Sequence, residues 1–275
     1  MRIKVENYLG QQLELKNVIS VDGLAPAGAT INTSTAGLSD GTFFNSSYTN
    51  QRNIVLTIVP DGDAESARLT LWKYFKPKHK TRLYFKTRTR DVYIDGYTEA
   101  VEGSPYSMKA AYSISIICPM PFFTDVNPSV YVQDYVTNAF AFPVNIPEEG
   151  LVLGSIQAND VDAVNFGEEK TGLIVKIKAN GEIVNPSIVN VTSREVFKLN
   201  IDLHDGDLVT IDSRRGSKSI TLERDGFTYN ILNDMSKDST WLTVSQGQNM
   251  FRFSADYGEN NITAEYIIST IYEGI

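Results

Sequence analysis

This chain of 275 residues has little cysteine and no long apolar run, so we expect no disulfide, no membrane span and no secretion signal. Its one cysteine, Cys118, excludes an intrachain disulfide, so we expect folding without covalent cross-links or in a reducing compartment. No apolar run approaches the ~20 residues that cross a bilayer. Residues 1–6 are charged and strand-like, which predicts no signal peptide.

Catalytic groups are also scarce. The chain has two histidines, His79 and His204, and no Gly-x-Ser-x-Gly elbow that would place a nucleophilic serine. His79 falls in a basic turn at residues 76–80. No glycine-rich phosphate loop precedes a helix. We therefore predict that the protein is not an enzyme, with no catalytic residue and no cofactor.

The acidic segment at residues 202–207 allows two interpretations. Asp202, His204, Asp205 and Asp207 could be ligands of a hard cation, but their spacing lacks the full EF-hand series and its closing glutamate. The favoured interpretation is a tight turn with solvated carboxylates, because Gly206 supplies a permissive backbone. We predict no metal site.

What the chain does contain favours β-structure in two domains. Its 14 tyrosines and 13 phenylalanines, with many valine, isoleucine and threonine residues, suit the pleated surface of a sheet. The net charge of −8 argues against general affinity for nucleic acid. Residues 1–140 carry a net charge of +1 and residues 141–275 a net charge of −9. With Pro143 and Pro147 near the junction, this shift predicts domains at 1–140 and 141–275.

The first half predicts an α+β domain in which one helix packs on a sheet. A helix is expected after Pro60, where acidic residues favour its N-terminus, and Pro77 ends it. Its packing face is formed by residues at helical spacing, namely Ala67, Leu71, Tyr74 and Phe75. Strands are expected at residues 2–6, 53–59, 82–86, 92–97 and 106–118.

The second half predicts an antiparallel β-sandwich. Turn pairs such as Asn180-Gly181 and Asp225-Gly226 separate many short apolar runs, a spacing that is typical of sandwiches. Strands are expected at residues 173–178, 183–184, 188–191, 196–201, 208–211, 219–222, 228–232, 249–253 and 262–270.

Residues 25–51 form a long segment rich in glycine, serine, threonine and asparagine. A connection of this length is uncommon inside a compact domain, so we expect either a surface loop or an arm that a partner orders. Phe43 and Phe44, with Tyr48 nearby, are its small apolar cluster. In the second case these side chains anchor in a neighbouring subunit, which makes Phe43 and Phe44 candidate oligomer-interface residues.

A basic run ends in Lys86, Arg88 and Arg90, which alternate and on a strand would share one face. One interpretation is a solvated edge whose charge discourages aggregation. The other, which we carry forward, makes Lys86, Arg88 and Arg90 part of an intersubunit surface that meets a neighbour's carboxylates. Nucleic-acid binding ranks third, because the aromatic residues that interleave with the charges are confined to Tyr84 and Phe85, which better fit a core.

Several segments, in order along the chain, resemble the distal tail proteins of siphophages. Residues 69–75 and 80–85 resemble the helix and strand of their first domain, residues 90–97 the next hairpin, and residues 113–123 the closing strand. The second-domain pattern is similar at Gly181, residues 185–188, Gly206-Asp207, Ile211-Asp212 and residues 247–249. The likeness covers almost the whole chain and points to a baseplate hub component of phages, or prophages, of Gram-positive hosts.

This resemblance implies a mainly β fold with a ring-forming N-terminal domain, assembled as a homo-hexamer, and a galectin-like C-terminal β-sandwich. It also implies contacts with the tail tube protein on one face and a tail-associated host-recognition protein on the other. The implied location is the virion tail tip, after synthesis in the host bacterial cytoplasm. An alternative is a carbohydrate-binding module for host cell-wall glycans, with Trp241 as the candidate stacking residue.

Overall fold

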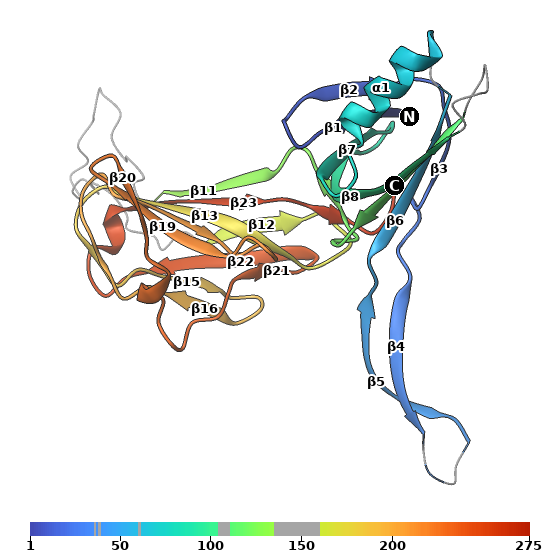
Figure 1. Cartoon of the computed structure of the whole chain (residues 1–275). Helices are drawn as coiled ribbons and strands as arrows, with labels where there is room; N and C mark the ends of the chain where they lie inside the picture. The colour runs from blue at the N-terminus through green and yellow to red at the C-terminus, as the bar shows by residue number, and fades with distance from the viewer. Residues whose placement is uncertain (36, 38–39, 60–61, 104–110, 135–159) are drawn as a thin grey trace, which may run out of the picture. The chain divides into compact units, whose positions relative to one another are not determined.

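The computed structural model describes residues 1–35, 37, 40–59, 62–103, 111–134 and 160–275. It divides into two compact units, one formed by Met1–Asn127 with Ile271–Ile275 and the other by Pro128–Thr270 (Figure 1). The predicted boundary between residues 140 and 141 lies outside the described residues. Two stretches nevertheless belong to the opposite unit from the predicted one. Residues 128–134 pair within the second unit and residues 271–275 pair within the first.

The first unit is built on one antiparallel sheet in the order β2-β1-β7-β8-β9-β6-β3, to which β10 and β24 are added beside β8. A separate hairpin, β4–β5, is inserted between β3 and β6. The elements are β1 (Arg2–Glu6), β2 (Gln12–Leu15), β3 (Val18–Asp22), β4 (Ala29–Thr35), β5 (Thr42–Thr49), β6 (Arg52–Ile58), α1 (Ala64–Tyr74), β7 (Lys80–Lys86), β8 (Asp91–Gly103), β9 (Tyr112–Cys118), β10 (Phe123–Asp125) and β24 (Ile271–Tyr272).

Alternation of apolar side chains places the sheet's inner face where the sequence predicts it. Tyr112, Ile114 and Ile116 of β9 are buried, and the intervening Ser113 and Ser115 are only partly so. Three residues of the neighbouring β6 are buried on the same side, namely Ile54, Leu56 and Ile58. The start of the strand predicted at residues 106–118 falls on residues 106–110, outside the described part of the chain.

The helix α1 begins with a side-chain cap and packs on this inner face. The Asp63 carboxylate accepts a hydrogen bond from the Ser66 backbone N–H (2.8 Å), which satisfies one of the free donors of the first turn. Leu71 and Phe75 are buried in the core of the unit. The predicted helix on a sheet is therefore confirmed, and the opposite side of the helix leaves Leu69 and Trp72 exposed.

The second unit is an antiparallel sandwich, as predicted. One sheet has the order β11-β23-β13-β18-β19-β20, with β21 beside β13, and the other has the order β12-β22-β15-β16. The rings of Phe251 and Tyr266 stack across the two sheets with centroids 4.9 Å apart, so both sheets share one core. At Asp225 and Gly226 the backbone takes φ of 52° and 79°, the left-handed pair that a tight β19–β20 hairpin requires.

Most strands of the second unit overlap the predicted runs, whereas β11, β12, β17 and β21 were not predicted. The elements of this unit are β11 (Ser129–Asp134), β12 (Val161–Asn165), β13 (Thr171–Ala179), β14 (Ile183–Val184), β15 (Ser187–Asn190), β16 (Glu195–Lys198), β17 (Asp202–Leu203), β18 (Leu208–Asp212), β19 (Ser219–Arg224), β20 (Phe227–Asn230), the 3-10 turns at Leu232–Asp234 and Glu259–Asn261, β21 (Thr243–Val244), β22 (Gly247–Ser254) and β23 (Ile262–Ile268).

Candidate functional site

The described part of residues 25–51 contains a two-stranded hairpin. β4 and β5 pair from Ala29 opposite Thr49 to Thr35 opposite Thr42, with one bulge between Asn32 and Thr33. Figure 1 shows the two strands extending beyond the sheet of the first unit. This corrects the expectation that the segment stays irregular until a partner orders it: β-branched and aromatic residues give it paired strands of its own.

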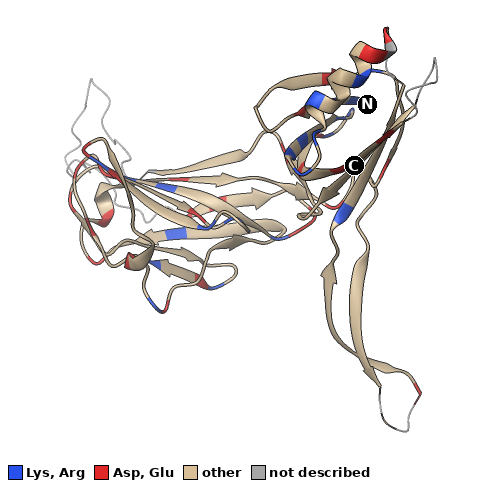
Figure 2. Ribbon diagram, viewed as in Figure 1, with Lys and Arg blue, Asp and Glu red and all other residues tan. Residues whose placement is uncertain are grey.

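The hairpin exposes large apolar side chains along its length. Ile31, Phe43, Phe44 and Tyr48 are between 58% and 65% exposed. Phe43 and Phe44 are neighbours on one strand, so they lie on opposite faces of the ribbon. Asp40 is the single charged residue from position 25 to position 50, and the ribbon is almost free of charge in Figure 2. Exposed apolar side chains on uncharged strands with free edges are characteristic of surfaces that bind other proteins.

Arg52, a buried residue (3% exposed), holds the base of this hairpin through its guanidinium group. Its Nη1 donates to the carbonyl oxygens of Gly23 and Ala25, both at 2.5 Å. Its Nε donates to the carbonyl oxygen of Pro121 (2.6 Å) and its Nη2 to that of Glu273. The guanidinium also lies over the Phe123 ring, 4.6 Å from the centroid. One side chain therefore joins the chain leading into the hairpin, the strand β10 and the returning C-terminal segment.

The C-terminal segment closes the same region. β24 pairs with β10 through Phe123 opposite Tyr272, and the Ile275 N–H donates to the Leu24 carbonyl oxygen (3.1 Å). A β-carbon on Gly274 would lie 3.0 Å from the same Leu24 oxygen, so the segment fits closely against the chain that enters the hairpin. The direction of the hairpin is thus fixed by contacts with residues more than two hundred positions away.

The predicted basic interface residues do not share a strand face. β7 ends at Lys86, and residues 87–90 form the turn of the β7–β8 hairpin, with the Thr87 N–H bonded to the Arg90 carbonyl oxygen. Lys86 forms an ion pair with Asp91 (2.7 Å). Arg90 lies over the Tyr272 ring, 4.2 Å from its centroid, and donates to the Gly274 carbonyl oxygen. Arg88 is exposed. The alternation along residues 86–90 misleads because a tight turn changes the side-chain direction that a strand would keep.

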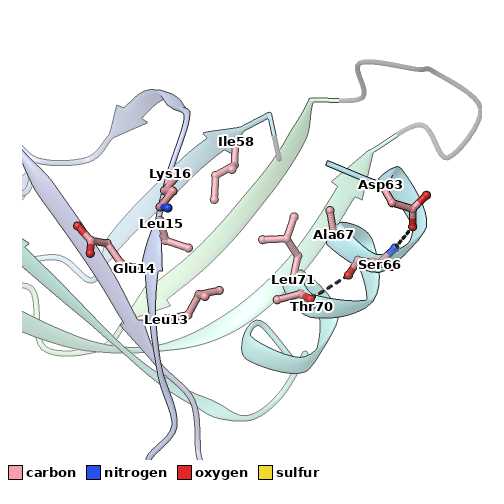
Figure 3. A pocket seen from close by; sticks show the side chains of 10 residues that line it. All are labelled: Leu13, Glu14, Leu15, Lys16, Ile58, Asp63, Ser66, Ala67, Thr70 and Leu71. Atoms are coloured by element: carbon pink, nitrogen blue, oxygen red, sulfur yellow. Dashed lines mark hydrogen bonds between the residues drawn. The ribbon is translucent and has the colours of Figure 1, made fainter. Parts of the chain in front are cut away.

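A cleft opens between α1 and β2, with a volume of about 430 Å³. Figure 3 shows apolar side chains of β2 facing apolar side chains of the helix. Polar groups surround the opening, and the hydroxyl of Tyr74 donates to the Gln12 carbonyl oxygen (3.3 Å), joining the end of the helix to the start of β2. The apolar lining consists of Leu13, Leu15, Ile58, Ala67 and Leu71.

In the second unit, the acidic turn at residues 202–207 is held by protein groups. The Asp207 carboxylate accepts hydrogen bonds from the Arg224 guanidinium (Nη2 at 2.5 Å) and from the His204 backbone N–H (2.8 Å). Burial alone would raise the pKa of Asp207, but these hydrogen bonds outweigh it and lower the pKa. Among the residues that the structure describes, no three potential ligands cluster as a metal site.

Asp207 should make the second unit sensitive to acid. Because its folded-state pKa lies below the unfolded value of about 3.9, its stabilising contribution is complete above that value and is lost as the pH falls through the folded pKa. We expect Asp207→Asn to lower the free energy of unfolding at pH 7 by about 1–3 kcal/mol. We also expect the variant to lose less stability than the wild type between pH 6 and pH 3. Urea denaturation across this range tests both, with the exposed Asp238→Asn as control; a parallel pH profile would contradict the assignment.

The other sequence candidates have structural partners. His79 stacks on Tyr8 with ring centroids 4.3 Å apart. Trp241 packs on the sandwich core beside Phe197, and the Lys218 ammonium lies 5.2 Å from its ring centroid. This arrangement gives no support to Trp241 as an open stacking platform for a sugar. In the described part of the chain, no helix is long and apolar enough to cross a membrane.

Comparison with known proteins gives a consistent result. Residues 166–267 match the family described as "Siphovirus-type tail component, C-terminal domain". No curated protein sequence matches the chain. Among solved structures, the Dit protein of phage SPP1, described as a paradigm of the hub adsorption apparatus in phages infecting Gram-positive hosts, has a TM-score of 0.69 at 10% identity. The match covers 97% of this chain and 98% of that one.

A second solved structure, from the phage P2 baseplate in its activated conformation with calcium, has a TM-score of 0.58 at 11% identity. This match covers 100% of the present chain and 99% of the other. Likenesses at such low identity establish the fold, and the family match adds sequence evidence within the second unit. Residues 166–267 are thus similar to the siphovirus-type tail components, and over almost its full length the chain has the fold of the SPP1 Dit protein.

Proposed function

We propose that this protein is the ring-forming hub of the tail tip, in which six copies assemble through their first units. The observation that carries the proposal is the β4–β5 hairpin, an uncharged ribbon with exposed aromatic residues on both faces. Left uncovered, its free edges would favour aggregation, so such a ribbon needs a protein surface to cover it. A closed ring would cover the hairpin, because each subunit of a ring binds one neighbour through one surface and the other neighbour through a different surface.

The charge of the chain favours the same assignment. The second half carries a net charge of −9, and copies of it brought together around a symmetry axis would repel one another. The first half carries a net charge of +1, so copies of it repel one another little when they pack together. We propose that the first units form the ring, which joins the tail tube protein on one face and a host-recognition protein on the other.

The mass of the full chain in solution tests this proposal. Native mass spectrometry and light scattering should both find a closed species of six times the 30.6 kDa of one chain. The fraction of chains in this species should rise with protein concentration. On dilution the species should dissociate without forming smaller closed rings. A monomer at every concentration, or an open series of lengths without a preferred one, would overturn the ring.

We further expect the purified protein to show no hydrolase activity. No nucleophile with a positioned base was found in the sequence, and His79 is occupied by its stacking on Tyr8. Assays of peptidoglycan and glycan turnover should therefore remain at the level of a buffer control. Turnover by the wild type that is lost in a His204→Ala variant would show that the protein is a hydrolase as well as a structural component.

A further inference from the structure

We infer that the cleft between α1 and β2 receives the start of β5, with Phe43 and Phe44, from a second copy of this chain. This inference rests on the proposed ring and deepens it by naming the surface that accepts the hairpin. The feature behind it is a juxtaposition within the first unit: an apolar cleft lies directly beside a sheet edge that has no strand on its outer side.

The acceptor surface is incomplete in the single chain. β2 pairs only with β1, so its other edge has no partner among the described strands, and the Gln12 carbonyl oxygen at the start of β2 accepts a hydrogen bond from the Tyr74 hydroxyl of α1. Beside this edge, Leu13 of β2 and Ala67 of α1 face the cleft, whose volume is about 430 Å³ (Figure 3). An extended strand added to such an edge gains main-chain hydrogen bonds, while the cleft takes every second side chain.

The hairpin has the properties that this surface requires. Its strands are regular and carry no charge except Asp40, so an apolar cleft can cover them without burying an unpaired ion. Because Phe43 and Phe44 lie on opposite faces, a strand beside β2 would direct one ring into the cleft and the other to the outer face of the sheet. Asp40, in the turn between β4 and β5, carries the charge opposite to that of Lys16, which lines the cleft.

The occupant must come from another copy. In Figure 1 the strands β4 and β5 extend from the end of the first unit that lies opposite α1 and β2, so they cannot reach the cleft of their own chain. The C-terminal segment and Arg52 hold the base of the hairpin in its direction. A donor at one end and an acceptor at the other give a heterologous contact, the kind that closes into a ring.

Cysteine cross-linking tests this contact in the full chain. The native Cys118 is buried, and burial raises the pKa of its thiol to about 12, so it should stay unreactive. We would compare two double variants, Phe43→Cys/Ala67→Cys and Phe44→Cys/Ala67→Cys, under mild oxidation. One of the two should give a ladder of cross-linked chains that ends at the size of the closed ring. The matched control replaces Ala67→Cys by Leu69→Cys, on the exposed side of the same helix.

Filling the cleft gives a second measurement. Ala67→Trp should weaken assembly at least tenfold in concentration and leave the unfolding temperature of the monomer within about two degrees of the wild type, whereas Leu69→Trp should assemble normally. If the ring forms but neither double variant cross-links and Ala67→Trp assembles normally, the acceptor is wrong and the ring stands. A wild-type chain that is monomeric throughout removes the proposed function itself, and this inference falls with it.

Discussion

Arg52→Met should destabilise the first unit by about 3–5 kcal/mol, because it removes four hydrogen bonds that a charged, buried side chain donates. The substitution keeps an unbranched apolar stem but removes the donors to the carbonyl oxygens of Gly23, Ala25, Pro121 and Glu273. Those oxygens, of which that of Pro121 accepts a buried hydrogen bond and the other three part-buried ones, would lose their donor. Urea denaturation measures the change, and Arg88→Met in the exposed β7–β8 turn is the matched control, with an expected effect within about 0.5 kcal/mol.

Hydrogen exchange should locate this loss. Amides of β3, β6, β10 and β24 should exchange faster in Arg52→Met, whereas amides of the second unit should be unchanged, because Arg52 contacts only the first. Arg52→Lys should fall between wild type and Arg52→Met, since an ammonium keeps the charge but not the planar fork of donors. Unfolding of Arg52→Met that matches the wild type would show that water or backbone adjustment satisfies the four oxygens.

The predicted strands and helix succeeded where one local pattern decides the structure. The alternation of β9 and the Asp-Gly turn between β19 and β20 need no distant partner to be recognised. The helix was also predictable, because acidic residues and proline mark its ends. In each case the sequence within about fifteen residues contains the information that the fold uses.

The features that build the candidate site depend on distant pairing instead. β24 is a two-residue strand whose partner, β10, lies about 150 positions earlier, so nothing near it predicts the pairing. In the sequence, Arg52 looks like an ordinary charged residue at the start of a strand. Its burial depends on four carbonyl groups that the fold brings together from separate segments of the chain. The hairpin was missed because serine, threonine and asparagine are common in both loops and exposed strands. In this segment, only Phe43 and Phe44 were predicted from the sequence as residues of a subunit interface.

Replacing Phe43 and Phe44 by serine should abolish or severely weaken assembly and leave the fold intact. Both side chains are 65% exposed in the single chain, so their loss should change the unfolding free energy by no more than about 0.5 kcal/mol. At a subunit contact, burying a phenylalanine side chain contributes about 1.5–3 kcal/mol. Even one buried ring per contact would therefore change the affinity of that contact by about ten- to a hundredfold. The effect is repeated at each contact of a closed ring, so the mass distribution should shift to monomer.

The variant is best measured against Ile19→Ser on β3, another large exposed apolar residue of the same unit but outside the hairpin. Light scattering should find the control assembled and the Phe43→Ser/Phe44→Ser protein monomeric, with equal unfolding temperatures. Hydrogen exchange provides the direct check. The hairpin has no core of its own, so amides of β5 should exchange quickly in the monomer and slowly in the ring, where a neighbour covers them. Equal exchange in both states, or normal assembly of the double variant, would mean that the hairpin stays outside the subunit contact.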